Sequence, residues 1–252
     1  MMPQRDLSSS MGQEAIRRVV AEQCLLAFDF DGTLAALVDD PTTATMSDEV
    51  YSDLAALAVC RPVAVITGRA RQDVLQRLPS GIAYVVGNHG CEFPDGDPLV
   101  LTQASKIATH WRSILTDMIV GTGLRLECKQ LSLALHWRGH HAGAASAELA
   151  AHFAMCLTPR PQLVEGDHVL NLLPPGLPDK GVALLRLMEI TGCQGALFVG
   201  DDITDAAVFR LRDPGILDIE VGNKTLGASW RVADTQAVAQ LIHTLASLAK
   251  LY

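Results

Sequence analysis

The sequence has no closely spaced cysteine pair and no concentration of positive charge, and both absences exclude classes of protein. Its six cysteines lie far apart, without the C-x-x-C spacing of metal clusters, at positions 24, 60, 91, 128, 156 and 193. This spacing also argues against a disulfide framework and favours a reducing compartment, so we expect a cytoplasmic protein. With 20 basic and 28 acidic residues, the net charge is −8 and no basic stripe is present, so we expect no nucleic acid partner.

Long apolar segments and repeats are missing as well. Met1 to Ser10 is polar and lacks the apolar stretch of a signal peptide, and we expect these residues to form a loose arm. No apolar run approaches the length that spans a membrane, so we expect no membrane partner. The 252 residues, 49% hydrophobic and 19% charged, can bury the core of one large domain or two smaller ones. We expect a globular monomer.

The most informative stretch is an apolar run that leads into two aspartates at alternate positions. It reads Leu25-Leu26-Ala27-Phe28-Asp29-Phe30-Asp31-Gly32-Thr33-Leu34. The run predicts a buried strand of a parallel sheet, with Asp29 and Asp31 at its carboxyl end, where open α/β sheets bind their ligands. Two close carboxylates repel each other, and a hard cation such as Mg²⁺ relieves that repulsion. Taken alone, the pattern favours a turn or a helix cap over a metal site, so the rest of the chain decides.

Polar clusters follow two further predicted strands. The run 62–66 ends in Thr67-Gly68-Arg69, and the run 195–199 ends in Gly200-Asp201-Asp202-Ile203-Thr204-Asp205. Lys180 begins the predicted helix that precedes the second cluster. The alternation of strands and helices requires a parallel sheet with right-handed crossovers, which brings the strand ends together. Several carboxylates, one lysine and one hydroxyl are therefore expected at one edge of the sheet.

A segment of different texture interrupts this pattern. It predicts helices over 102–120 and 142–156 and antiparallel hairpins over 124–137 and 162–173. This αββαββ order is typical of an inserted α+β domain. We expect a parallel-sheet core from residues 1–98 and 175–252, with 99–174 as the insert.

The residue types at the sheet edge suit phosphoryl transfer. A carboxylate beside Mg²⁺ can attack phosphorus, because the metal offsets the repulsion between two anions. A second carboxylate can protonate the leaving oxygen and then activate water. Thr67 and Lys180 can hold the phosphoryl oxygens as their charge increases.

The order of these motifs resembles that of the haloacid dehalogenase (HAD) superfamily of phosphatases. The resemblance implies a Rossmann-like α/β core with a C2-type cap, formed by the insert. It also implies that Asp29 is the nucleophile and Asp31 the general acid/base, and that Thr67 and Lys180 bind phosphate. Asp29, the backbone carbonyl of Asp31 and Asp201 would bind Mg²⁺, supported by Asp202 and Asp205.

Further motifs resemble the trehalose-6-phosphate phosphatase family over residues 24–240. They are Gly87-Asn88-His89-Gly90-Cys91-Glu92, Glu127-Cys128-Lys129 and Ala134-Leu135-His136-Trp137-Arg138. By this resemblance Glu127 and Lys129 contact the sugar. The chain departs from the family where Asn171 replaces a glutamate, Leu173 a basic residue and Ala206 a glutamate. The full set of expected substrate-binding residues is Gly68, Arg69, His89, Glu127, Lys129, Arg138 and Asn171.

Alternatives stay open for several of these residues. Arg69 fits a cap or an ion pair as well as a phosphate ligand, and His89 fits a loop histidine nearly as well as a site residue. The main hypothesis is a Mg²⁺-dependent phosphatase that hydrolyses trehalose 6-phosphate through an aspartyl-phosphate. A second hypothesis keeps the chemistry with another glycosyl phosphate, such as glucosylglycerol phosphate or mannosylglycerate phosphate. A third is a sugar-phosphate-binding domain without catalysis, against which the complete set of catalytic residues argues.

Overall fold

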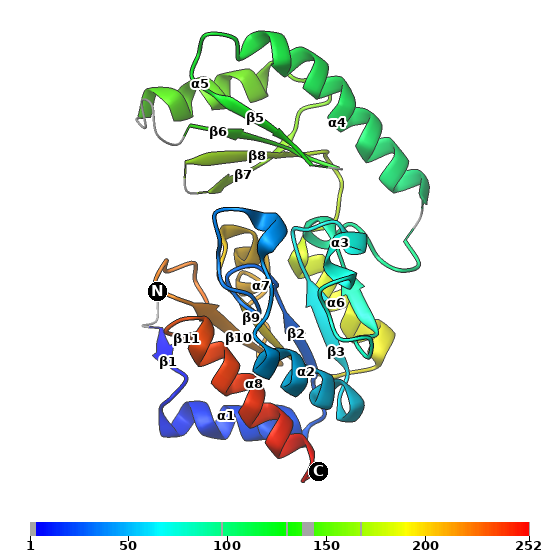
Figure 1. The fold of residues 1–252 in the computed structure, drawn as a ribbon, viewed down its shortest axis with the longest axis vertical. Helices are drawn as coiled ribbons and strands as arrows, with labels where there is room; N and C mark the ends of the chain where they lie inside the picture. Colours follow the sequence, from blue (N-terminus) through cyan, green and yellow to red (C-terminus); the bar gives the residue numbers. More distant parts are fainter. Residues whose placement is uncertain (1–3, 97, 130, 138–143, 167, 252) are drawn as a thin grey trace. The chain divides into compact units, whose positions relative to one another are not determined.

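The computed structural model describes residues 4–96, 98–129, 131–137, 144–166 and 168–251. It divides into two compact units, one built from Met1–Pro94 with Pro178–Tyr252 and the other from Asp95–Leu177. The units carry a parallel and an antiparallel sheet respectively (Figure 1). No helix within the described residues is long and apolar enough to cross a membrane.

The first unit is a seven-stranded parallel sheet with helices on both faces (Figure 1). In spatial order its strands are β1 (Arg5–Asp6), β11 (Trp230–Val232), β10 (Ile216–Val221), β9 (Ala196–Gly200), β2 (Leu25–Phe28), β3 (Val63–Ile66) and β4 (Tyr84–Val86). Its helices are α1 (Ser10–Ala21), α2 (Asp48–Cys60), α3 (Arg71–Leu75), α6 (Lys180–Thr191), α7 (Ala206–Phe209) and α8 (Thr235–Ala249). Single helical turns occur at η1 (Pro41–Thr43), η2 (Asn88–Gly90) and η3 (Ile203–Asp205).

Strand β2 shows why the sheet needs cover on both faces. All four of its residues are buried. Leu26 and Phe28 belong to the apolar cluster on the side of α1, α2 and α8, whereas Leu25 and Ala27 belong to the cluster on the side of α6 and α7. Side chains alternate along a strand, so an uninterrupted apolar run fits a strand that is buried from both sides.

The prediction of a loose N-terminal arm is wrong for its last residues. Arg5 and Asp6 form β1, which pairs in parallel with β11, and Leu7 is buried. The Arg5 guanidinium lies 5.5 Å from the centre of the Trp230 ring. Strands as short as β1 and β11 carry too few residues to show a period, and their pairing depends on distant parts of the chain.

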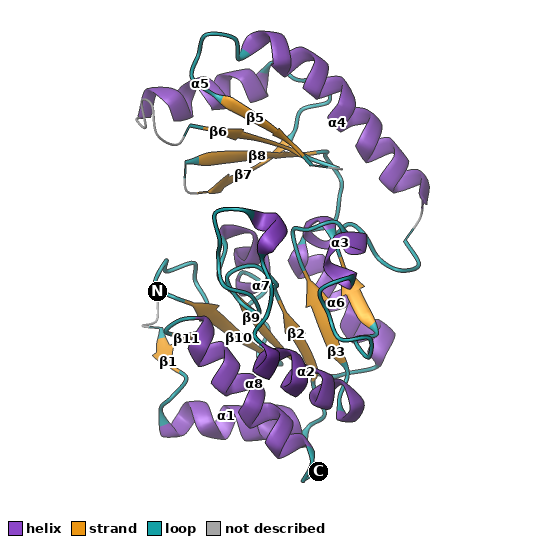
Figure 2. Ribbon diagram, viewed as in Figure 1, coloured by secondary structure: helices purple, strands orange, loops and turns teal. Residues whose placement is uncertain are grey.

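The second unit follows the predicted αββαββ order (Figure 2). Its antiparallel sheet has the order β5 (Arg125–Cys128), β6 (Leu133–His136), β8 (Val169–Leu173) and β7 (Gln162–Gly166). Helices α4 (Pro98–Met118) and α5 (Ala144–Met155) pack on one face through an apolar cluster that includes Trp111, Leu135 and Leu172. The predicted fold class, a parallel α/β core with an inserted α+β segment, is confirmed.

Candidate active site

The two aspartates after β2 lie in a tight loop at the carboxyl end of the sheet. The Asp29 N–H donates to the carbonyl of Val199 on β9, at 2.9 Å, which continues the pairing one residue beyond β2. Gly32 then turns the chain, with a φ of +76°, and a Cβ at this position would lie 2.3 Å from the Asp201 carboxylate. Glycine is therefore needed here both for the backbone conformation and for the close approach of the two acidic segments.

Lys180 lies at the centre of the acidic cluster. It is the first residue of α6, which begins there because the Asp179 side chain accepts a hydrogen bond from the Val182 N–H. The Lys180 Nζ lies 2.9 Å from the Asp29 Oδ1 and 2.6 Å from the Asp205 Oδ1. The side chain is 1% exposed, and such a buried ammonium requires charged partners. These two ion pairs raise the pKa of Lys180 against the opposing effect of burial, so the lysine stays charged.

Burial has the opposite effect on the carboxyl groups around Lys180, because it favours their neutral form. Burial raises the pKa of Asp29 well above its usual value and raises the pKa of Asp205, although Lys180 lowers both. Burial raises the pKa of Asp201 to about 6. Lys180 and the half-exposed Lys224, whose Nζ lies 3.3 Å from the Asp201 Oδ2, do not balance three buried carboxylates, so the cluster favours an additional positive charge.

The donor set fits a magnesium ion. Asp29, Asp201 and Asp205 each offer a carboxylate oxygen within 4.8 Å of the others. Both oxygens of Asp205 are already engaged, one by Lys180 and the other by the Asp202 N–H. The Asp201 Oδ1 is buried without a hydrogen-bond partner among the described residues. Oxygen-only ligands with a surplus of negative charge suit a hard divalent cation. Asp29 and Asp201 are therefore better placed than Asp205 to hold such an ion, and the Asp202 N–H holds the second oxygen of Asp205.

Thr67 and His89 lie next to each other at the ends of neighbouring strands. Thr67 follows β3 and is fully buried, and its N–H donates to the carbonyl of Val86 at 3.0 Å. The His89 N–H donates to the Thr67 carbonyl at 2.9 Å. A Cβ on Gly68 would lie 2.5 Å from the His89 ring, so any larger residue at position 68 would displace this ring.

The loop 87–92 lies between Thr67 and the start of α6 and contacts both. Its residues Asn88, His89 and Gly90 all have positive φ, at +48°, +60° and +111°. Glu92 stabilises the loop, because its carboxylate accepts hydrogen bonds from the Arg71 N–H and the Asn88 side chain, both at 2.7 Å. Gly90 lies so close to the Asp179 carbonyl that a Cβ would be 2.4 Å away. The loop therefore fixes the spacing between two parts of the site.

Two of the predicted sugar-binding residues of the second unit, Glu127 and Asn171, lie on the sheet face that α4 and α5 leave uncovered. Cross-strand register places Glu127 opposite Ala134 and Ala134 opposite Asn171, so these residues form one row. The Glu127 carboxylate lies 2.7 Å from the His136 Nε2, and this contact is the main reason that the pKa of Glu127 is lowered. The Asn171 amide donates to the carbonyl of Val164 at 3.2 Å. Lys129 follows β5, and Arg138 lies outside the described residues.

Two contacts at the site were not expected from the sequence. Lys224, in the loop after β10, places its Nζ 3.3 Å from the Asp201 Oδ2. Arg69 contacts Asp31 through two hydrogen bonds. The rule that polar residues after a buried strand point to the site would have identified Lys224 had it been applied to β10. The partner of Arg69 has no sequence signal, because 38 residues separate it from Asp31.

A parallel sheet with this insert, and a buried lysine among aspartates at its carboxyl edge, define the HAD class of phosphatases. Structural comparison agrees in fold. The chain matches the C-terminal domain of Candida albicans trehalose-6-phosphate phosphatase at a TM-score of 0.70 and 20% identity, over 97% of this chain and 98% of that one. It matches a trehalose-6-phosphate phosphatase related protein at 0.65 and 24% identity, over 90% and 99%.

Sequence comparison identifies the family. The family model for trehalose-phosphatase matches residues 27–238. The chain is 27% identical over 257 residues to trehalose 6-phosphate phosphatase RA3 of Zea mays, covering 90% of this chain and 70% of that protein. It is 28% identical over 247 residues to a trehalose-phosphate phosphatase of Mycobacterium tuberculosis, covering 90% and 62%. The chain belongs to the trehalose-phosphatase family.

Proposed function

We propose that this chain is a Mg²⁺-dependent phosphatase that hydrolyses trehalose 6-phosphate to trehalose and phosphate. The observation that carries the chemistry is the buried Asp29 carboxylate, held 2.9 Å from Lys180 in one cluster with Asp201 and Asp205. The family membership supports the substrate. We also propose a cytoplasmic monomer that binds neither nucleic acid nor membranes, in keeping with six free cysteines and a net charge of −8.

The first step of the proposed reaction transfers the phosphoryl group to Asp29. A carboxylate oxygen of Asp29 attacks phosphorus, and the bond between phosphorus and the sugar oxygen breaks. Asp31 donates a proton to that oxygen, so the sugar leaves as an alcohol. Lys180 lies 2.9 Å from the Asp29 Oδ1, and Thr67 follows β3, the strand that pairs with β2, so both can hold phosphoryl oxygens as they gain charge.

The second step returns the enzyme to its starting state. Asp31, now ionised, takes a proton from water, which attacks the phosphorus of the aspartyl-phosphate and releases phosphate from Asp29. When bound at Asp29, Asp201 and the Asp31 carbonyl, Mg²⁺ would neutralise phosphoryl charge. Glu127, Lys129 and Asn171 would bind the sugar.

Phosphate release from a panel of sugar phosphates, with Mg²⁺ and with EDTA, tests this proposal. We expect Mg²⁺-dependent turnover of trehalose 6-phosphate far above that of glucose 6-phosphate. Asp29→Asn is expected to lower kcat by about 10⁴-fold or more with an unchanged circular dichroism spectrum, because the amide is not a nucleophile. Turnover near the wild-type rate in this variant would contradict the mechanism.

The replacement of a glutamate by Asn171 favours a second substrate class, other glycosyl phosphates. Asparagine offers only a neutral acceptor, so its grip on sugar hydroxyls is weaker. A preference for glucosylglycerol phosphate or mannosylglycerate phosphate in the same panel would keep the mechanism and change the substrate. No Mg²⁺-dependent activity on any ester would favour a sugar-phosphate-binding domain.

A further inference from the structure

Arg69 forms a bidentate ion pair with the Asp31 carboxylate. Its Nε donates to the Asp31 Oδ2 at 2.7 Å, and its Nη2 donates to the Asp31 Oδ1 at 2.6 Å. The guanidinium also lies 5.3 Å from the centre of the Phe30 ring, which precedes Asp31 in the chain. A two-point contact between planar groups fixes orientation as well as distance. Asp31 nevertheless stays 34% exposed, so a substrate can reach it.

The remaining donors of Arg69 are almost all in use. Its Nη1 donates to the Asp73 carboxylate at 2.9 Å, and its Nη2 also donates to the Pro41 carbonyl at 2.7 Å. These contacts occupy about four of the roughly five N–H groups of a guanidinium. The side chain is also 10% exposed. An arginine in this state has little capacity left for a phosphoryl group, so its contacts favour the ion pair over the phosphate ligand among the alternatives for Arg69.

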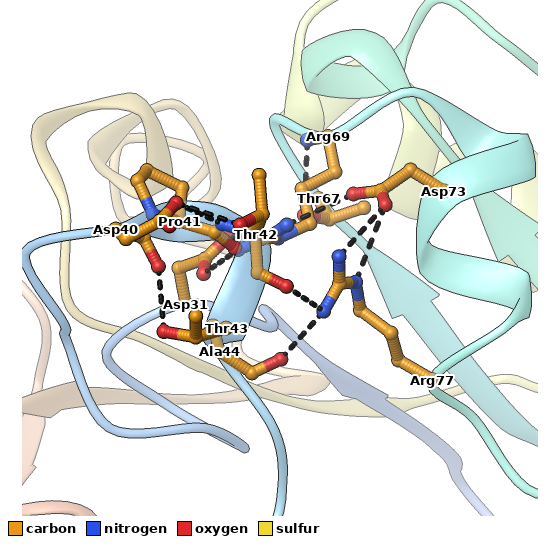
Figure 3. A network of polar contacts seen from close by, with 10 residues as sticks. All are labelled: Asp31, Asp40, Pro41, Thr42, Thr43, Ala44, Thr67, Arg69, Asp73 and Arg77. Atoms are coloured by element: carbon orange, nitrogen blue, oxygen red, sulfur yellow. Dashed lines mark hydrogen bonds and ion pairs between the residues drawn. The ribbon is translucent and has the colours of Figure 1, made fainter.

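A second arginine, Arg77, supports this arrangement through Asp73 (Figure 3). The Arg77 Nη2 donates to Asp73 at 2.9 Å, so Asp73 lies between the two arginines. The Arg77 Nη1 donates to the carbonyls of Thr42 and Ala44, at 3.1 and 2.8 Å. The loop after β2, which carries Asp31, is therefore connected to helix α3 through the side chains of Arg69, Asp73 and Arg77. We call these three side chains the Arg69 relay.

We propose that Arg69 is a positioning residue that orients Asp31 for catalysis, and that Asp73 and Arg77 fix Arg69 for this task. The inference deepens the proposed function, because it rests on Asp31 as the general acid/base. When Asp31 is ionised, it keeps both hydrogen bonds from Arg69. When one of its oxygens carries the proton for the leaving group, the other oxygen keeps its hydrogen bond. Arg69 thus orients the carboxyl group in both steps without contacting substrate.

The test compares two esters that differ in their need for a proton. A sugar oxygen leaves as an alcohol and needs the proton from Asp31, whereas p-nitrophenolate leaves without one. Because kcat/KM reports transfer to Asp29, the ratio of kcat/KM on the two esters measures the contribution of the acid. Arg69→Lys is the main variant, since lysine keeps the charge and loses the two-point contact. Asp31→Asn is the reference.

The proposal predicts a selective loss. Arg69→Lys is expected to lower kcat/KM on trehalose 6-phosphate by about 10–30-fold, which is less than the roughly 10²–10⁴-fold that a general acid contributes in full. On p-nitrophenyl phosphate the loss should be about 3-fold or less. Asp31→Asn should show the same selectivity with a larger loss. Asp73→Asn and Arg77→Lys should show it with losses of about 3–10-fold, because they act through Arg69. The inhibition constant of inorganic phosphate should stay within about 3-fold of wild type in Arg69→Lys.

Two results would overturn the proposal. Equal losses on both esters would show that the relay only supports the fold. Arg71→Lys gives the pattern of such a variant, because Arg71 is the first residue of α3, the helix that carries Asp73. Arg71 donates to the Val85 carbonyl and lies outside the relay. A rise of about 10-fold or more in the phosphate inhibition constant would show that Arg69 contacts the phosphoryl group, since losing part of a charged hydrogen bond has this size.

Failure of the proposed function gives a different result. If the wild type does not hydrolyse trehalose 6-phosphate, the comparison uses the sugar ester that it hydrolyses fastest, and the selectivity still tests the relay. If Asp31→Asn itself shows no selectivity between the esters, Asp31 is not the acid and the inference fails with that assignment.

Discussion

The two sheets of this chain carry polar residues in opposite ways. The parallel sheet is apolar on both faces, and its functional charges gather at the carboxyl edge, where Asp29, Lys180 and Asp205 are buried and paired. The antiparallel sheet is apolar only on the face under α4 and α5. Its other face carries Glu127, which is 47% exposed at its side chain.

On the proposed function, this difference would separate the chemistry from the selection of the substrate. Buried charges are fixed before substrate arrives, and removing one leaves its partners uncompensated, so substitutions there should act on turnover and stability together. An exposed polar group stays solvated by water. Substitutions of exposed residues on the face of the antiparallel sheet that α4 and α5 leave uncovered should therefore have smaller effects, mainly on substrate affinity. The following experiments test this separation.

Loss of the Lys180 charge should have the largest effect. Lys180→Met keeps an unbranched side chain that is one atom shorter, and it leaves Asp29 and Asp205 without their cation. We expect the free energy of unfolding at pH 7.5 to fall by about 3–5 kcal/mol, as for other broken buried ion pairs. The loss should be smaller at pH 5, where the carboxyl groups take up protons. Urea unfolding at both pH values measures it, and kcat should fall as well.

Lys224 supplies the matched control. It also pairs with an aspartate of the cluster, Asp201, but its side chain is 47% exposed. Lys224→Met should therefore change the free energy of unfolding by about 1 kcal/mol or less. Equal losses in the two variants would show that burial does not set the contribution of these pairs.

Mg²⁺ should stabilise the protein more at pH 7.5 than at pH 5. Burial raises the pKa of Asp201 to about 6, above the value of about 4 in unfolded chains. The stability that this carboxyl contributes is thus complete below pH 4 and lost as the pH rises through 6, where the ionised group needs a cation. At a free concentration 100 times its Kd, Mg²⁺ should raise the Tm at pH 7.5 by about 5–10 °C.

Asp201→Asn distinguishes this site from general salt effects. The amide does not ionise. In EDTA, the variant should therefore lack the part of the fall in Tm between pH 4 and pH 6 that ionisation of Asp201 causes in the wild type. Adding Mg²⁺ should raise its Tm much less than that of the wild type. A Mg²⁺ response equal to that of wild type would place the ion elsewhere.

Glu127→Gln should act on affinity alone. A neutral amide loses a charge-assisted hydrogen bond to a sugar hydroxyl, so the KM for trehalose 6-phosphate should rise by about 10-fold. The Tm and the activity on p-nitrophenyl phosphate should stay unchanged. Glu165→Gln is the control, because Glu165 is exposed on the same sheet but its strand partner Leu170 belongs to the apolar face. A fall in kcat on both esters would break the separation.

The parts of the site that the sequence predicted share one physical basis. Asp29, Thr67 and Asp201 each follow a buried run, and a parallel sheet brings the ends of such runs together whatever their distance in the chain. The helix start at Lys180 was predicted in the same way from its place before such a run. Local pattern and topology together were sufficient to predict that these residues lie at the carboxyl edge of the sheet.

The rest depends on contacts between side chains that no local pattern encodes. Asp73 and Arg77 lie four residues apart on the chain, which is typical of an ordinary surface pair, and nothing in their spacing points to Arg69 and Asp31. The pairing of β1 with β11 joins the two ends of the chain, and these strands are too short to be recognised. The hydrogen bond from the Asn171 amide to the Val164 carbonyl likewise depends on the pairing of two strands and has no local sequence signal.

Asn171→Glu should have the smallest effect and sharpens the comparison most. It restores the charged acceptor typical of the family, so kcat/KM on trehalose 6-phosphate should rise by about 3–10-fold if the sugar binds at this position. Asn171 is only 8% exposed, however, and its amide donates to the Val164 carbonyl. A glutamate cannot donate this hydrogen bond, so the free energy of unfolding should fall by about 1 kcal/mol.

The two readouts of this variant have different meanings. Asn171→Gln keeps a donor and adds no charge, so it should give no gain in kcat/KM, and it shows the cost of the longer side chain. A gain in kcat/KM with glutamate but not with glutamine means that the side chain at position 171 contacts substrate. Such a contact would come from a residue that is buried, unlike Glu127. A loss of stability without any gain in kcat/KM means that Asn171 serves the sheet itself, and that the sugar is selected by the exposed residues of the same face.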